Sequence, residues 1–348
     1  MKRTEREINI FAGERPRVLL LGNGLNRAYN GRSWDRLLDS IKDREDFPLD
    51  AEKYIMPMPL KAAMLTNNKL ASRMREIVQQ EDPSDGSDDP ERITWRDFTD
   101  TNREMRAQIR QIVKHFDYVL TTNYSYEIEM ALLDADTLTP DRIAKLMNHH
   151  EVDHAQTMFL TNTFNLVNNT PIWHIHGEAR KPDSMIIGSS YYGKLLRRCV
   201  ERIDGSNTGG KEREYKGNVR NEKPQKIGSW IDAFVLGDVY ILGLSLDFSE
   251  SELWWLIDYK SCHPEICGRT FYYDPLQEPR GVCLADGKTP CKESSSFADG
   301  RQCRNYLLKT YQVDTNDLGI TIRTDEDYKA FYDHAAKAFD RDLTVCGR

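Results

Sequence analysis

Short apolar runs alternate with amphipathic stretches along most of this chain. A nearly continuous apolar run predicts a buried strand, whereas apolar positions spaced three and four residues apart predict a helix. The predicted strands cover residues 17–21, 118–121, 170–176, 185–188, 239–243 and 270–274, with an edge strand at 320–322. The predicted helices cover residues 25–41, 102–113, 125–133, the stretch around 253–257, and 326–339. Strands that alternate with helices indicate an α/β fold with a doubly wound, mostly parallel Rossmann-like sheet.

Four polar or irregular stretches interrupt this rhythm. Residues 47–112 carry proline and methionine among helix-forming residues, and they predict a helical insertion within the domain. The acidic segment 79–91 inside it predicts a loop. Residues 202–226 are polar and rich in glycine, lysine and asparagine, which predicts a mobile loop, and residues 276–304 predict irregular structure. We find no internal repeat and expect residues 1–348 to form one domain.

Composition narrows the classes of function. The 348 residues carry a formal net charge of −7 and the pI is about 5.7, so no global field attracts nucleic acid or an anionic membrane. No window approaches the roughly 20 apolar residues of a membrane span. The charged start of the chain has no secretory apolar core. We therefore expect a cytoplasmic protein that binds neither nucleic acid nor a membrane directly.

Cysteine spacing bears on metal binding. The chain has seven cysteines and no CxxC pair, so a zinc ribbon has no ligand spacing. Five of the cysteines lie between residues 262 and 303, which leaves a metal site there open. Ordinary reduced cysteines, without a metal, are the expected state.

The first candidate site residues lie where the strand 17–21 ends. The segment Gly22-Asn23-Gly24-Leu25-Asn26 connects this strand to a predicted helix. Glycines permit a tight turn and close approach to a phosphate, and a helix N-terminus supplies free N–H groups. A turn that only needs positive φ would also select glycine. The third glycine of the hydride-transfer fingerprint is missing, and no acidic strand end follows about 20 residues later, which argues against a dehydrogenase.

A second polar turn ends the strand 118–121. It consists of Thr121, Thr122, Asn123 and Tyr124. Open α/β sheets hold their ligands at the carboxyl ends of the strands, and the Asn123 amide can donate and accept hydrogen bonds at once. This amide therefore suits a ribose hydroxyl, an amide or a water molecule.

Two histidines end the strand 170–176. His174 and His176 have strand spacing, so we expect both on one face of the sheet, and Gly177 follows them. A metal would need a third ligand, which the sequence does not nominate. With a reference pKa of about 6.5, an imidazole at a strand end can take a proton at neutral pH. His176 fits that role, with a hydrogen-bonded core histidine as the alternative, and His174 is expected to be structural.

The last candidates follow two further predicted strands. Gly243 and Ser245 would let a ribose or phosphate come close, and Ser245 offers a hydroxyl. The same segment predicts a capping box between Ser249 and Glu252 at the start of a helix. Asp274 either pairs with a ribose diol or begins a turn with the proline that follows it.

Taken in chain order, these motifs resemble the sirtuin family, and more closely the sirtuin-like NAD-cleaving domain of bacterial antiphage defence proteins such as the Thoeris effector. The sirtuin segments G-A-G-x-S, T-Q-N-I-D, H-G and G-T-S-L are matched by Gly22–Asn26, Thr121–Ser125, His176–Gly177 and Gly243–Leu246. Ser33–Leu38 is similar to the S-W-x-x-L-L segment of the defence branch. The agreement spans about residues 16–275. No segment matches the sirtuin zinc ribbon, which argues against deacylase activity.

The resemblance implies hydrolysis of the nicotinamide–ribose bond of NAD to nicotinamide and ADP-ribose, without a metal, in antiviral defence. It implies Asn123 and His176 as catalytic residues. The residues that it implies for NAD binding are Gly22, Asn23, Gly24, Asn26, Thr122, Gly243, Ser245 and Asp274. Because an unregulated NADase would harm its host, we expect a homo-oligomer or a regulatory protein in trans, such as an ATPase. Two other functions stay open: a nucleotide-binding sensor or scaffold without catalysis, and a protein ADP-ribosyltransferase or deacylase.

Overall fold

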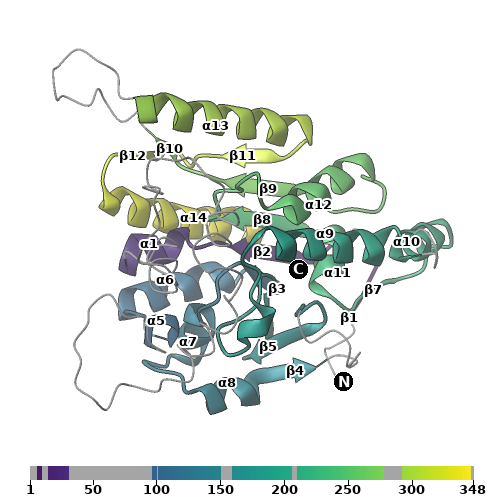
Figure 1. Ribbon diagram of the computed structural model, residues 1–348, viewed down its shortest axis with the longest axis horizontal. Helices are drawn as coiled ribbons and strands as arrows, with labels where there is room; N and C mark the ends of the chain where they lie inside the picture. The colour runs from purple at the N-terminus through teal and green to yellow at the C-terminus, as the bar shows by residue number, and fades with distance from the viewer. Residues whose placement is uncertain are drawn as a thin grey trace.

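The structure is a computed structural model that describes residues 6–9, 15–30, 96–99, 101–149, 159–205, 210–277 and 292–345. At its centre is an eight-stranded sheet in the order β11-β9-β8-β2-β3-β6-β5-β4 (Figure 1). The strands are β2 (Arg17–Leu21), β3 (Tyr118–Thr121), β4 (Met147–His149), β5 (Thr163–Val167), β6 (Thr170–His174), β8 (Asp238–Leu242), β9 (Thr270–Tyr273) and β11 (Asp314–Asn316). The pairs β6–β5 and β5–β4 are antiparallel, and the other neighbouring pairs are parallel. The predicted α/β, mostly parallel Rossmann-like fold is confirmed.

The strand order reverses at one point of the sheet. From β2 the chain adds β3 and β6 on one side, and it then returns to the other side of β2 with β8, β9 and β11. Open α/β sheets bind ligands outside the carboxyl ends of the strands at such a switch point. Here the switch point lies between β2 and β8, where Leu21 pairs with Leu242 in the last register position of both strands. The turns that follow these strands therefore start side by side.

Helices cover both faces of the sheet. One layer consists of α1 (Gly24–Asn30), α6 (Arg103–Val113), α7 (Glu127–Leu133) and α14 (Asp325–Val345). The other layer contains α9 (Ser189–Ile203), α11 (Trp230–Leu236) and α12 (Ser251–Cys262), and Figure 1 shows the two groups on opposite sides of the central strands. Because α7 and α12 belong to different layers, side chains directed to them leave the sheet on different faces.

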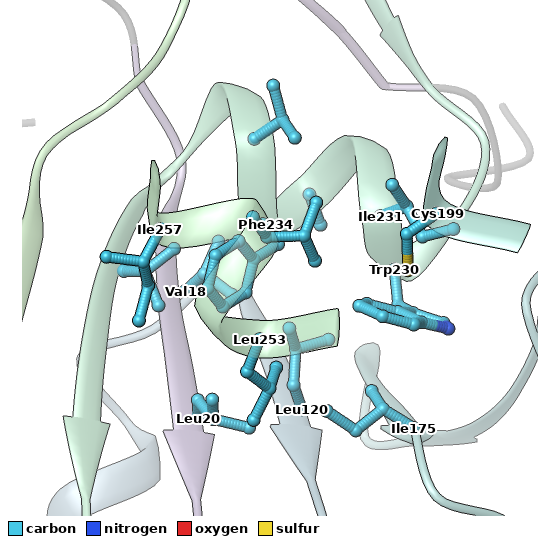
Figure 2. Packing of buried hydrophobic residues seen from close by; sticks show 14 of the residues in the cluster. Val18, Leu20, Leu120, Ile175, Cys199, Trp230, Ile231, Phe234, Leu253 and Ile257 are labelled. Carbon is cyan, nitrogen blue, oxygen red and sulfur yellow. The ribbon is translucent and has the colours of Figure 1, made fainter. Parts of the chain in front are cut away.

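Side chains of the central strands alternate between the two layers. Leu19 and Leu21 of β2 pack with the α1–α6–α7–α14 layer, whereas Leu20 packs with the α9–α11–α12 layer. Figure 2 shows this second core, in which Leu20 lies among side chains of α11 and α12 such as Phe234 and Leu253. Full burial of one such side chain stabilises the fold by roughly 1.5–3 kcal/mol. The two-sided burial explains why β2 reads as a continuous apolar run.

The remaining elements lie around this core. The helices are α5 (Arg96–Thr99), α8 (Pro140–Leu146), the 3-10 turn η4 (Pro182–Ser184), α10 (Lys211–Arg220) and α13 (Lys292–Thr310). Two small sheets pair β1 (Arg6–Ile8) with β7 (Gln225–Ile227) and β10 (Leu276–Gln277) with β12 (Thr321–Ile322). Of the insertion predicted over 47–112, the described part contains α5 and most of α6. Residues 31–95, which include Ser33–Leu38 and the predicted loop 79–91, lie outside the described residues.

Several predicted elements need correction. The segment 202–226 is not a loop over its described length, because α9 runs to Ile203, α10 covers Lys211–Arg220 and β7 begins at Gln225. The helix α10 buries mainly one side chain, Tyr215, so it shows no apolar rhythm in the sequence. Residues 185–188 form no strand. The range 276–304 contains the first part of α13, and 321–322 pairs with β10 instead of forming the edge of the main sheet.

Two basic side chains hold the amino edge of the sheet, opposite the switch point. Lys260 donates from Nζ to the carbonyls of Phe234 (2.7 Å) and Gly237 (2.8 Å), at the end of α11 and just before β8. Arg15 donates from Nη1 to the carbonyl of Leu236 (3.0 Å). These contacts satisfy carbonyls that a helix end leaves without an intrahelical partner. Burial lowers the pKa of Lys260 to about 7.

Candidate functional site

Two glycines of the turn after β2 pack directly on the turn after β8. The N–H of Gly22 donates to the Leu242 carbonyl (2.9 Å), and the N–H of Gly24 donates to the Gly243 carbonyl (2.7 Å). A Cβ on Gly22 would lie 2.5 Å from the Gly243 oxygen, and a Cβ on Gly24 would clash with the hydroxyl of Tyr332 from α14. This packing accounts for both glycines. A phosphate at the turn would have to use the N–H groups of other residues.

The Asn26 amide ties the start of α1 to the turn after β3. Its Nδ2 donates to Asn23 Oδ1 (3.1 Å) and to Ser125 Oγ (3.4 Å). Its Oδ1 is buried and has no hydrogen-bond partner among the described residues. The structure thus brings the predicted residues Asn23 and Asn26 together with the polar turn that contains Asn123.

Asn123 is buried at the carboxyl end of β3. Its N–H donates to Thr121 Oγ1 (3.0 Å), and its Nδ2 donates to Glu127 Oε1 (2.5 Å) and to the Gly22 carbonyl (3.3 Å). Thr122 beside it is also buried. Within the described residues, the Oδ1 atom of Asn123 is buried without a partner. The amide is therefore fixed through its donors, and its oxygen is the atom left to accept a hydrogen bond.

His174 clamps the backbone of this turn from the same face. Its Nδ1 lies 2.7 Å from the carbonyl oxygen of Asn123, and its Nε2 lies 2.9 Å from Glu129 Oε1 on α7. Burial would lower the pKa of His174, but the Glu129 carboxylate, together with Glu178 and the Asn123 carbonyl, raises this pKa to about 9. A protonated imidazole donates from both nitrogens, which matches both contacts. The arrangement agrees with the structural role expected for His174.

His176 is directed to the other face of the sheet. Its Nε2 lies 2.7 Å from Glu252 Oε1 on α12, and its ring meets the edge of Tyr192 on α9 at 5.3 Å between centroids. The prediction that His174 and His176 share one face is wrong. The reason is that β6 ends at His174 and the next residues form a turn closed by Gly177, whose φ is +92°. Strand alternation no longer applies beyond that point.

The described residues show no contact between the side chains of Asn123 and His176. Their backbones nevertheless stay adjacent at the sheet edge. Thr121 pairs with His174, and the N–H of Ile175 donates to the Thr121 carbonyl (2.9 Å). Neighbouring strands lie about 4.8 Å apart. The amide and the imidazole thus leave one edge from adjacent strands, the first toward α7 and the second toward α12.

Ser245 and Asp274 are joined by an arginine that sequence reasoning missed. Arg304 of α13 donates from Nη1 to the Ser245 carbonyl (2.8 Å) and from Nη2 to Asp274 Oδ2 (2.5 Å). Arg301 Nη1 lies 3.6 Å from the same carboxylate oxygen. The Ser245 residue itself is exposed. Two cations thus hold the Asp274 carboxylate. The contact of Asp274 with a ribose diol, which the sequence suggests, stays a prediction.

Glu252 is the second missed residue. The predicted capping box with Ser249 is wrong, because the Glu252 carboxylate bonds to His176 and Ser249 instead bonds to Asp247 (2.8 Å from its N–H to Oδ1). A helix-capping motif and a buried ion-pair partner share the same residue type. No local signal separates the two readings, since the histidine lies 76 residues away in the chain.

The chain matches no protein-family model, and it matches no curated protein. The resemblance to the sirtuin family therefore stays a prediction that rests on the motifs. Within the described ranges, no three His, Cys, Asp or Glu side chains gather as a metal ion would require. The cysteines described as free thiols are Cys199, Cys262, Cys267 and Cys303. Among the helices in the described part of the chain, none has the length and apolar character to cross a membrane.

Proposed function

We propose that the protein binds NAD at the carboxyl edge of its sheet and hydrolyses the nicotinamide–ribose bond. The observation that carries this proposal is a pair of buried amide oxygens beside the switch point. Oδ1 of Asn26 and Oδ1 of Asn123 have no hydrogen-bond partner among the described residues. A buried acceptor left without a partner costs about 1–3 kcal/mol. Other buried atoms in the described residues also lack a partner, but these two follow β2 and β3 at the carboxyl edge, where open α/β sheets hold ligands. Ribose hydroxyls are donors that would satisfy them.

The strand order supports a dinucleotide as the ligand. The sequence β6-β3-β2-β8-β9-β11 follows the 3-2-1-4-5-6 order of dinucleotide-binding sheets, which bind across the switch point. Under this proposal the pyrophosphate lies at the turn after β2, and the adenosine ribose lies near Ser245 without a direct contact to the Asp274 carboxylate, which Arg301 and Arg304 hold. Gly22 and Gly24 shape the turn, and the N–H groups at the start of α1 face the phosphates. A fold of this kind hosts many unrelated functions, so the side chains at the sheet edge decide the activity.

The reaction assigns distinct tasks to the two predicted catalytic residues. The bond between C1′ of the ribose and the pyridinium nitrogen breaks, and its electron pair leaves with neutral nicotinamide. A water oxygen bonds to C1′ and its proton passes to His176, so the products are nicotinamide, ADP-ribose and a proton. Asn123 Oδ1 accepts a hydrogen bond from the water or from a ribose hydroxyl. A placed proton acceptor contributes roughly 10²–10⁴ in rate.

Both side chains have to reach one substrate. Under this proposal a ribose lies over the ends of β3 and β6, between the Asn123 amide on the α7 side and the His176 imidazole on the α12 side. Because both side chains are buried, the edge has to open for the substrate to enter. Nε2 of His176 is bonded to Glu252. Nδ1 has no hydrogen-bond partner in the described part of the chain, so it is the nitrogen proposed to take the proton.

Product chromatography tests the proposal. Purified protein is incubated with NAD over a range of protein concentrations, because the predicted homo-oligomer would depend on concentration. We expect nicotinamide and ADP-ribose, and turnover at least about 10²-fold lower in Asn123→Ala and His176→Ala, with circular dichroism showing that both variants fold. His334→Ala, on the exposed side of α14, is the matched control.

Other outcomes of the same experiment would contradict the proposal. Full activity in both site variants removes the mechanism. NAD that binds without release of nicotinamide indicates a sensor or scaffold instead. Labelled ADP-ribose that stays on protein indicates a transferase.

A further inference from the structure

Glu252 and His176 form a buried pair that joins distant parts of the chain. The 2.7 Å contact between Oε1 and Nε2 connects the first turn of α12 to the residue pair after β6. The His176 side chain is 2% exposed and the Glu252 side chain is fully buried. Removing a carboxylate from water is expensive, and a buried ion pair often adds little net stability compared with apolar packing. Stability alone therefore does not explain why this pair is buried here, whereas a role in positioning the imidazole does.

Other titratable groups lie around the pair of His176 and Glu252. Burial, followed by the nearby charges of Glu252 and Asp247, raises the pKa of Glu250 well above its ordinary value. Burial likewise raises the pKa of Tyr192 and of Tyr124, which lie around the pair from α9 and from the turn after β3. Cys199 on α9 is also buried, and its thiol pKa is raised. Among these neighbours, Glu252 is the carboxyl group whose oxygen lies within hydrogen-bond distance of the ring, at 2.7 Å from Nε2.

The chain contains a second histidine–glutamate pair that serves as a comparison. Both nitrogens of His174 are bonded, one to Glu129 and the other to the Asn123 carbonyl. In the pair of His176 and Glu252, by contrast, only Nε2 is bonded within the described residues. His174 therefore has no ring nitrogen left to accept a proton, whereas His176 has one.

We infer that Glu252 is a positioning residue that fixes the ring of His176 with Nε2 as donor and Nδ1 as proton acceptor. This inference rests on the function proposed above. When Nδ1 takes the proton from water, the imidazolium lies against the carboxylate and is stabilised by it. The same division of roles operates in hydrolytic triads, which are recognised by geometry and not by chain order.

The pH dependence of NAD hydrolysis tests this role. Glu252→Gln keeps the size of the side chain and a hydrogen-bond acceptor but removes the charge. We expect kcat to fall by roughly 10²–10⁴-fold with KM changed less than about threefold. The acidic limb of the kcat/KM profile should move to lower pH, because the imidazole loses the charge that favours its protonation. Glu252→Asp should recover part of kcat.

Glu129→Gln is the matched control. It removes the same charge from the closed pair, so it should lower stability while leaving the acidic limb at its wild-type pH. An acidic limb that moves equally in both variants would overturn the inference, since the effect would then be general. Wild-type kcat and an unmoved limb in Glu252→Gln would overturn it as well, while the proposed hydrolase function would stand.

Nitrogen NMR of histidine-labelled protein gives a readout that does not need activity. Wild-type His176 should show one neutral tautomer, protonated at Nε2, and Glu252→Gln should show a mixture. Glu252→Asp serves if Glu252→Gln does not fold. No nicotinamide release by the wild type would remove the proposed function, and the NMR result would then decide the orientation on its own. An unchanged tautomer in the variant would end the inference.

Discussion

The backbone N–H of Gly24 donates a 2.7 Å hydrogen bond to the carbonyl oxygen of Gly243. This bond fastens the turn after β2 to the turn after β8. Tyr332 of α14 lies over both turns, and its hydroxyl occupies space that a Cβ at either glycine would need. The switch point of the sheet is therefore assembled from three distant parts of the chain, and its packing leaves no room for a larger residue at position 24.

Gly24→Ala should destabilise the protein through overpacking. The added Cβ would meet the Tyr332 hydroxyl and would lie 2.8 Å from the Gly243 oxygen, so we expect the free energy of unfolding to fall by about 1–3 kcal/mol. Urea denaturation measures it. Gly193→Ala on α9 is the control, since its Cβ meets nothing within 4 Å, and alanine in a helix is favoured by roughly 0.5–1 kcal/mol. Equal effects of the two changes would contradict the packing argument.

Tyr332→Phe should rescue part of this loss. It removes the hydroxyl that the new Cβ meets, whereas the contact with the Gly243 oxygen remains. In a double-mutant cycle, Gly24→Ala should therefore cost less in the Tyr332→Phe background than in the wild type. Additive free energies would show that Tyr332 does not limit the space at this turn.

The pair of His174 and Glu129 should make stability fall as the pH rises. The pKa of His174 is about 9 in the folded protein, against about 6.5 in the unfolded chain. Between these values the folded state holds a proton that the unfolded state has lost, so the stabilisation is complete below about pH 6.5 and disappears as the pH passes 9. The full effect is of order 3 kcal/mol.

Glu129→Gln isolates this contribution. The difference in unfolding free energy between wild type and variant should be largest near pH 6 and shrink toward pH 9, as measured by denaturation at several pH values. A difference that stays constant over this range would mean that His174 is not protonated in the folded state.

Asp274→Asn should affect stability more than NAD binding. The change leaves the guanidinium of Arg304, whose side chain is 6% exposed, without its charged partner, so we expect a loss of about 1.5–3 kcal/mol. KM for NAD should change less than about twofold. The control is Asp314→Asn, whose pair with Arg269 is exposed and should contribute at most about 1 kcal/mol. A large rise in KM at full stability would instead favour a ribose contact.

Elements with two-sided burial could be predicted from the sequence. β2 and β3 begin and end where the apolar runs 17–21 and 118–121 do. α6 begins directly after Asn102, whose Oδ1 accepts from the N–H of Met105 (2.7 Å). In these places the local sequence pattern agrees with the tertiary structure, because the strand residues are buried in the core and Asn102 caps the helix.

Elements stabilised by polar contacts could not be predicted in this way. The helix α10 is formed by residues such as Lys216, which pairs with Glu212 one turn earlier at 2.5 Å. Its buried Tyr215 donates to Asp232 of α11. The i,i+4 spacing of opposite charges was the sequence feature that favoured a helix here. The many glycines and lysines around it favoured a loop instead.

The face of the sheet to which His176 points could not be predicted from the local sequence either. Periodicity assigned His174 and His176 to one face because it assumes an unbroken strand. The positive φ of Gly177 belongs to a turn that reverses the direction of the second imidazole. The partner of that imidazole, Glu252, lies on a helix that follows two further strands, so only the assembled sheet brings them together.

The hydrogen bonds of Lys260 and Arg15 to backbone carbonyls form a clamp at the amino edge of the sheet. A variant that weakens this clamp would show how much activity is lost through lower stability alone. The clamp lies one strand length, about 16 Å for five residues, from the edge where the proposed reaction takes place. The clamp bonds to the carbonyls of Phe234, Leu236 and Gly237, none of which contacts His176. Loosening the clamp would therefore weaken the cohesion of the sheet without removing a contact of the imidazole. Any site variant can be judged against a clamp variant of matched stability.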